Sequence, residues 1–99
     1  MPTETVRVVA RITARPETAG ELKSLLLRLV QPTRAESGCV RYELHQSQTD
    51  PADFVFLEEW KDGAAIAAHM QTPHVQEALA KAATLLAAPP DIRRYHLIA

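Results

Sequence analysis

The chain has little of several residue types on which common protein chemistry depends. It contains one cysteine, Cys39, so no disulfide can form within it. Its three glycines, Gly20, Gly38 and Gly63, are too scattered to form a phosphate-cradling loop. The 11 basic residues form no Lys/Arg-rich run and are balanced by 12 acidic ones. Binding to nucleic acid is therefore not expected, because phosphate affinity depends on concentrated positive charge.

Long apolar runs and targeting signals are also missing. Runs such as Leu25 to Leu27 are far shorter than the roughly 20 residues that a membrane-spanning helix needs. Residues 1–5 lack the basic start and apolar stretch of a secretory signal. Together with the single cysteine, this favours a cytoplasmic protein that does not bind membranes. The 99 residues are expected to form one domain.

What the chain does contain is a clear order of apolar patterns. Alternation predicts strands over residues 6–13, 40–48, 54–60 and 92–98. Leucines at helical spacing predict a helix that opens at Pro16, can kink at Pro32 and ends by Gly38. Two short helices are predicted over 63–70 and 73–86, the second capped by Thr72. The order β-α-β-β-α-β predicts a ferredoxin-like α+β fold: an antiparallel four-stranded sheet with helices on one face.

The strand over 54–60 has apolar side chains on both faces. Phe54, Phe56 and Trp60 alternate with Val55 and Leu57. Helices cover only one face of such a sheet, and an open apolar face tends to associate. We therefore expect a homodimer whose sheets pack face to face.

Two acids, the only tryptophan and a histidine follow one another at the end of this strand and in the next helix. Glu58 shares a strand face with Phe56 and Trp60, and Glu59 points to the opposite face. A carboxylate on an apolar face must be paired or protonated, so the inward acid is expected to pair with His69 or with an arginine. Strand twist or a bulge leaves the choice between the two acids open. The alternative is that both acids are solvated at a strand end.

His69 and the nearby aromatic residues each allow a functional and a structural interpretation. His69 follows Ile66 by three residues, so both face inward on a regular helix, and imidazole suits proton transfer near neutral pH. The alternative is a histidine that only satisfies a backbone carbonyl. Trp60 can stack on a flat substrate or fill the core, and Tyr42 can bind a ligand oxygen or pack with its hydroxyl at the rim.

The other histidines and the cysteine offer no recognisable site. His74 and His96 are interpreted as surface residues, and His45 as lying on the strand face opposite Tyr42. The four histidines, His69 included, could converge in space, but their spacing gives no support for a metal site. Cys39 has no neighbouring motif that would activate it, so we interpret it as a small buried apolar residue.

Several segments resemble the antibiotic biosynthesis monooxygenase (ABM) domain family. Residues 32–44, PTRAESGCVRYEL, resemble its R-x-E-x-G-C-x-x-Y-x-L stretch. Residues 56–60, FLEEW, and 65–69, AIAAH, match its hydrophobic-E-x-W and A-x-x-x-H segments. The resemblance covers nearly the whole chain, including the start of the second short helix and the Pro89-Pro90 pair.

The resemblance implies a dimeric α+β barrel with a pocket between sheet and helices. Family members include cofactor-independent monooxygenases that oxidise quinols or polyketide anthrones with molecular oxygen. Carried onto this chain, it implies catalytic roles for His69 with Glu58 and Glu59. The implied substrate-binding residues are the aromatic and apolar ones, Trp60, Tyr42, Phe56 and Ile66.

The resemblance also bears on cofactors. Haem-degrading members of the family have an asparagine on the first strand and an iron-binding histidine in the second short helix. This chain has Ala10 and Leu79 there, which argues against haem. We expect no cofactor and no metal.

Three hypotheses follow from these observations. The first is a cofactor-free monooxygenase that oxidises a quinol-like or phenolic small molecule with oxygen. The second is an isomerase that moves protons on a small hydroxy-ketone, for which a phosphorylated substrate needs a cationic wall from Arg7, Arg11 or Arg94. The third is a non-catalytic dimeric binding module in which His69 and Trp60 are simply packed.

Overall fold

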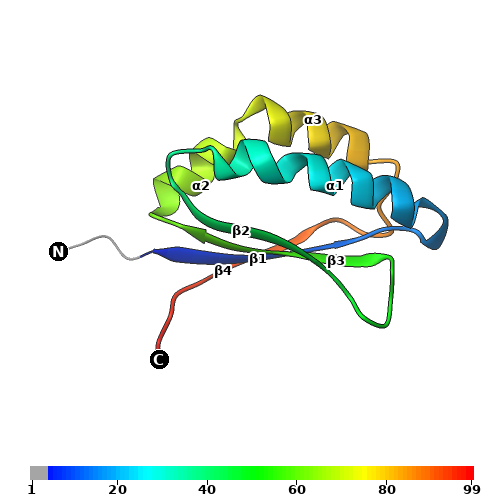
Figure 1. Ribbon diagram of the computed structural model, residues 1–99, viewed down its shortest axis with the longest axis horizontal. Helices are drawn as coiled ribbons and strands as arrows, with labels where there is room; N and C mark the ends of the chain where they lie inside the picture. Colours follow the sequence, from blue (N-terminus) through cyan, green and yellow to red (C-terminus); the bar gives the residue numbers. More distant parts are fainter. Residues whose placement is uncertain (1–4) are drawn as a thin grey trace.

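The computed structural model describes residues 5–99 and has a sheet covered on one face by helices (Figure 1). The strands are β1 (Val6–Thr13), β2 (Cys39–Gln46), β3 (Asp53–Trp60) and β4 (Asp91–Tyr95). The helices are the short 3₁₀ helix η1 (Pro16–Thr18), α1 (Ala19–Arg34), α2 (Gly63–Met70) and α3 (Pro73–Ala82). The strands pair antiparallel in the order β2-β3-β1-β4. This confirms the predicted ferredoxin-like α+β fold.

The prediction that residues 1–5 carry no secretory signal concerns residues that lie almost wholly outside the described part of the chain. Within residues 5–99, no helix is long and apolar enough to cross a membrane.

Element boundaries differ from the sequence prediction mainly near the carboxyl end. Helix α3 stops at Ala82, before the predicted residue 86, because the chain turns back towards the sheet there. The N–H of Arg15 donates to the Leu85 carbonyl at 3.1 Å, and Leu86 forms an isolated bridge with Ala14. Helix α1 continues through Pro32, and β4 is shorter than the predicted 92–98.

Strand β2 starts with an irregularity that simple alternation did not predict. Cys39 pairs with Trp60 and Arg41 pairs with Glu59, so Val40 is an extra residue without a partner on β3. As a result Val40 is 57% exposed instead of facing inward. The regular alternation resumes beyond the bulge, and Tyr42 is buried.

The core lies between the sheet and the helices and fixes the surroundings of the site. Helix α1 contributes a stripe of leucines, as its spacing predicted. The sheet contributes the aromatic rings of its inward face, with Tyr42 stacked on Phe56 at a centroid distance of 4.7 Å. The largest fully buried side chains are Trp60, Phe54, Phe56, Leu22 and Thr33.

Within residues 5–99, no helix lies on the opposite face of the sheet (Figure 1). On β3, Leu57 is 37% exposed and Val55 is half-buried on this face. Ion pairs flank them: Arg7 with Glu59 at 3.5 Å and Arg11 with Asp53 at 3.0 Å. The strand therefore has two partly apolar faces, as its sequence predicted.

Candidate functional site

The centre of the candidate site is a carboxylate shared by two histidines. Oε2 of Glu36 lies 2.8 Å from Nδ1 of His69 and 2.7 Å from Nε2 of His74. The three side chains, called here the acid–histidine cluster, are 15%, 7% and 24% exposed, respectively. A carboxylate oxygen can only accept, so both hydrogen bonds require a hydrogen on the ring nitrogen that faces it. The geometry therefore assigns hydrogens to His69 Nδ1 and His74 Nε2.

Glu36 reaches the histidines because the loop after α1 lies very close to α2. A Cβ atom on Gly38 would overlap the side chain of Ala65, so only glycine allows this approach. The N–H of Lys61 donates to the Gly38 carbonyl at 2.9 Å and fixes the loop to the end of β3. The loop thereby carries Glu36 to the helix that holds His69.

The turn between α2 and α3 fixes the two histidines relative to each other. The Asp62 carboxylate caps α2 by accepting from the N–H of Ala65 at 2.8 Å. The Thr72 hydroxyl donates to the His69 carbonyl at 2.7 Å and accepts from the N–H of Val75 at 3.4 Å. Thr72 therefore caps α3, as predicted, and also links the end of α2 to it.

Aromatic side chains surround the buried imidazole of His69. The rings of His69 and Trp60 have centroids 4.6 Å apart, and the Tyr42 ring lies edge-on to His69 at 5.8 Å. Phe56 stacks on Tyr42, and Ile66 is buried on the same helix as His69. The predicted Trp60, Tyr42 and His69 thus come together, in a closely packed wall.

The two predicted acids have separate roles in the fold. Glu58 faces inward, but its Oε1 accepts from the Trp60 indole N–H at 2.8 Å. Glu59 lies on the open sheet face beside Arg7. The expectation that the inward acid pairs with His69 or with an arginine is therefore wrong, because the partner of Glu58 is Trp60. Alternation sends Glu58 inward, yet its carboxylate bonds to the indole on its own strand, two residues on.

Sequence reasoning missed both Glu36 and His74. His74 was interpreted as a surface residue, but only 24% of its side chain is exposed and it bonds to Glu36. Glu36 lies 33 residues from His69 and 38 from His74, so no local pattern connects them. The available signal was the glutamate in the stretch that resembles the ABM family.

Burial controls the ionisation of the groups beside the cluster. Burial raises the pKa of Glu58 to about 7; the Trp60 hydrogen bond opposes this rise and the Glu36 charge adds to it. Burial, with the Glu58 charge, raises the pKa of Tyr42 above its usual range. Burial and the charges of Glu36 and Glu58 also raise the pKa of Cys39. The phenol and the thiol therefore stay protonated at neutral pH, which makes Cys39 a poor nucleophile.

Two hollows at the surface border the acid–histidine cluster. Glu36 lines one of about 420 Å³ between its loop and α2, together with Lys61, Ala68 and Thr72. His74 lines a second of about 160 Å³ between α1 and α3.

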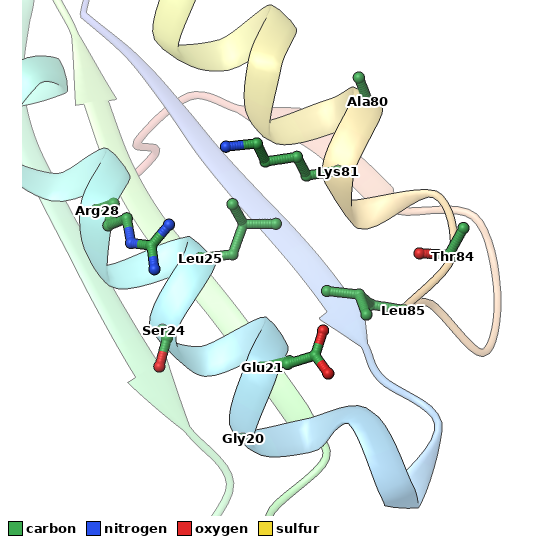
Figure 2. A pocket seen from close by; sticks show the side chains of 9 residues that line it. All are labelled: Gly20, Glu21, Ser24, Leu25, Arg28, Ala80, Lys81, Thr84 and Leu85. Atoms are coloured by element: carbon green, nitrogen blue, oxygen red, sulfur yellow. The ribbon is translucent and has the colours of Figure 1, made fainter.

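The second hollow adjoins a larger one between the same two helices. This hollow measures about 760 Å³ and shares Leu25, Arg28 and Lys81 with its neighbour. Figure 2 shows Arg28 and Lys81 reaching from facing helices over it. His69 and Trp60 line none of these three hollows. Access to the cluster is therefore through Glu36 and His74.

The arrangement supplies two kinds of chemistry. A carboxylate hydrogen-bonded to imidazoles in a partly dry setting can accept and pass on a proton. The same three residues present one potential metal-ligand atom each, all within 4.8 Å of one another. His69 and His74 thus come together although their spacing gave no support for a site, while His45 and His96 remain exposed and apart from the cluster.

Comparison with known proteins shows the family to which this chain is similar. The sequence profile described as "Antibiotic biosynthesis monooxygenase" matches residues 5–81. The Bacillus subtilis protein "Putative monooxygenase YcnE" is 42% identical over 88 residues, covering 89% of this chain and 93% of that protein. The Synechocystis protein sll1783 is 33% identical over 90 residues, covering 91% of this chain; the chain spans only 61% of that longer relative.

A solved structure agrees over the full length. The structure of PA3566 from Pseudomonas aeruginosa superposes with a TM-score of 0.94 at 34% identity, covering 100% of this chain and 99% of that one. The chain belongs to the antibiotic biosynthesis monooxygenase family.

Proposed function

We propose that the protein is a monooxygenase that oxidises a phenolic or quinol-like small molecule with molecular oxygen. One observation carries this proposal: the 2.8 Å hydrogen bond between Glu36 and the buried His69, packed against Trp60. In a member of this family, a preformed acid–imidazole pair is suited to removing the proton of a phenol. Family membership supports the monooxygenase reaction, and the acid–imidazole pair supports a phenolic or quinol-like substrate.

The reaction needs no group beyond substrate and oxygen for its balance. Loss of the hydroxyl proton gives a phenolate, which is electron-rich enough to give an electron to oxygen. In the simplest case, a phenol with a free para carbon and O₂ become a quinone and water. One oxygen atom forms the new carbonyl at that carbon, the other leaves in water, and the carbon loses its hydrogen.

Glu36 is the member of the cluster that meets the substrate. It lines the hollow of about 420 Å³, so a hydroxyl bound there can donate its proton to the carboxylate. His69 and His74 stabilise the carboxylate before transfer by donating to Oε2, and the substrate proton goes to the other carboxylate oxygen, Oε1. Lys61, at the wall of the same hollow, stabilises the phenolate that remains.

The aromatic and apolar wall keeps water away from the imidazole of His69. Its members are buried in this structure: Trp60, Tyr42, Phe56 and Ile66. Direct stacking of a substrate on Trp60 requires α2 to move away from the sheet.

The quaternary structure proposed with this function is a homodimer. The helix-free sheet face carries Leu57, Val55 and two ion pairs, a mixed surface that a second sheet can cover. A partner there would leave the acid–histidine cluster, on the other side of the sheet, unobstructed.

An oxygen electrode tests the proposed reaction. The untagged protein, treated with chelator, is mixed with a panel of naphthols, hydroquinones and anthrones. We expect at least one to drive oxygen uptake, and Glu36→Gln and His69→Gln each to lower kcat by about 100-fold or more. His45→Gln is the matched control, because His45 pairs with Glu43 on the exposed side of β2. Uptake that is absent with every compound, or unchanged in both cluster variants, would refute the proposal.

The isomerase alternative finds less support. Arg7 and Arg11 are held in ion pairs on the open sheet face, and Arg94 is exposed on β4. None of them lines the hollow beside Glu36. A cationic wall for a phosphorylated substrate would therefore rest on Lys61 alone.

A further inference from the structure

We propose that Glu36, His69 and His74 form a binding site for a divalent transition-metal ion, of the two-histidine, one-carboxylate type. This inference goes beyond the proposed oxidation and does not depend on it. Two imidazoles and a carboxylate are ligands that zinc and ferrous iron both accept, with further positions open to water. These three residues alone among the described part of the chain bring such a donor set together.

The donor atoms are already close to metal-binding geometry. Glu36 Oε2 lies 2.8 and 2.7 Å from the two imidazole nitrogens, and all three atoms fall within 4.8 Å of one another. Ligands of a tetrahedral zinc ion, bound at about 2.0 to 2.1 Å, are roughly 3.3 Å apart. Each present hydrogen bond therefore has to lengthen by only about half an ångström.

Binding needs a change of tautomer and no loss of charge from the histidines. In the metal-free protein, His69 Nδ1 and His74 Nε2 carry the hydrogens that Glu36 accepts. A neutral histidine can move this hydrogen to its other ring nitrogen and give the freed lone pair to the metal. The Glu36 carboxylate then supplies a negative charge to the ion.

The site also has an approach and an open coordination position. His74 borders a hollow that shares lining residues with the large one between α1 and α3, and Figure 2 shows the large one. Glu36 faces the other hollow, from which water can complete the coordination. A bound ion takes the negative charge of the carboxylate to which we assign the substrate proton. Metal binding and phenol deprotonation therefore compete for one group.

Titration of the chelator-treated, untagged protein with Zn²⁺ tests the site. Isothermal titration calorimetry without any substrate should give one ion per chain, and Co²⁺ should give the visible absorption bands of a nitrogen- and oxygen-bound ion. Zn²⁺ should also raise the melting temperature. Glu36→Gln and His74→Ala should each weaken binding by more than about 100-fold, beyond the 10- to 100-fold that outer-shell partners contribute.

Matched controls separate this site from adventitious histidine binding. His45→Ala removes an exposed histidine that also neighbours a glutamate, and it should leave the affinity unchanged. His74→Ala is the safer cluster variant, because Glu36 keeps its bond to the buried His69; circular dichroism checks its fold. The proposal is overturned if the parent protein binds no ion, or if His45→Ala weakens binding as much as His74→Ala does. Since no substrate is present, an inactive protein would not affect this result.

Discussion

Replacing Glu58 by glutamine should reduce the loss of folding stability that occurs as the pH rises from 4.5 to 8. Glu58 is 9% exposed and hydrogen-bonds the Trp60 indole, and burial is the main cause that raises its pKa from 4.5 to about 7. A carboxyl group with a raised pKa in the folded state binds its proton more tightly there than in the unfolded chain. Its stabilising effect is therefore complete below about pH 4.5 and is lost as the pH rises through 7.

The size of the effect follows from the shift. Raising a pKa from 4.5 to about 7 corresponds to a change of about 3 kcal/mol in the free energy of unfolding, since one unit is worth about 1.4 kcal/mol. Glutamine keeps an oxygen that can accept from the indole N–H but has no proton to lose. The stability of Glu58→Gln relative to the parent should therefore rise by about 3 kcal/mol between pH 4.5 and pH 8.

Urea denaturation followed by tryptophan fluorescence measures this difference, because Trp60 is the only tryptophan. Chelator in every buffer keeps metal out of the comparison. The difference between variant and parent removes most of the pH dependence that the two proteins have in common. Glu59→Gln, next to it on the open face, is the matched control and should not show this rise. If the stabilities of Glu58→Gln and of the parent change in parallel over this range, the inference that Glu58 binds its proton more tightly in the folded state is refuted.

Three further predictions concern packing, capping and assembly. Gly38→Ala should lower the free energy of unfolding, measured in urea, by about 1 to 3 kcal/mol, because the new methyl group meets α2. Gly20→Ala is the control and should stabilise the fold slightly, because the space around Gly20 is open. Thr72→Ala should lower the free energy of unfolding by about 1 kcal/mol through loss of the cap of α3, and unchanged urea midpoints would contradict this. Leu57→Glu should convert a dimer to monomers in sedimentation experiments, while Leu79→Glu, on an exposed part of α3, should not; equal behaviour of the two would contradict the face-to-face assembly.

Local periodicity accounts for most of the fold. Alternation located β1 and the inward face of β3, and the Thr72-Pro73 pair located the start of α3. The boundaries that differ have tertiary causes. Val40 is displaced by a bulge against β3, and α3 ends where the chain returns to pair near Ala14. Neither cause is visible within a short window of sequence.

The candidate site was less predictable for the same reason. Residues on one element, such as Trp60 and Glu58, were correctly placed on one strand face, although the choice of the inward acid was left open. The decisive contact joins three separate segments through the Glu36 carboxylate, and it depends on the close approach that Gly38 allows. Spacing in the sequence carries no information about such an approach. It also cannot show that an inward carboxylate is satisfied by a neighbour on its own strand.

The short helix α2 is held by its buried face and by contacts at its ends, and this has a consequence for motion. With eight residues it is too short to be stable in isolation, so its helical state depends on this packing, on the caps at Asp62 and Thr72, and on the contact of His69 with Glu36. Protonation of Glu36 would weaken one of these attachments. The backbone amides of α2 should then exchange with solvent together and earlier than those of α1. A substrate that gives its proton to Glu36 would thus loosen the segment that separates it from Trp60.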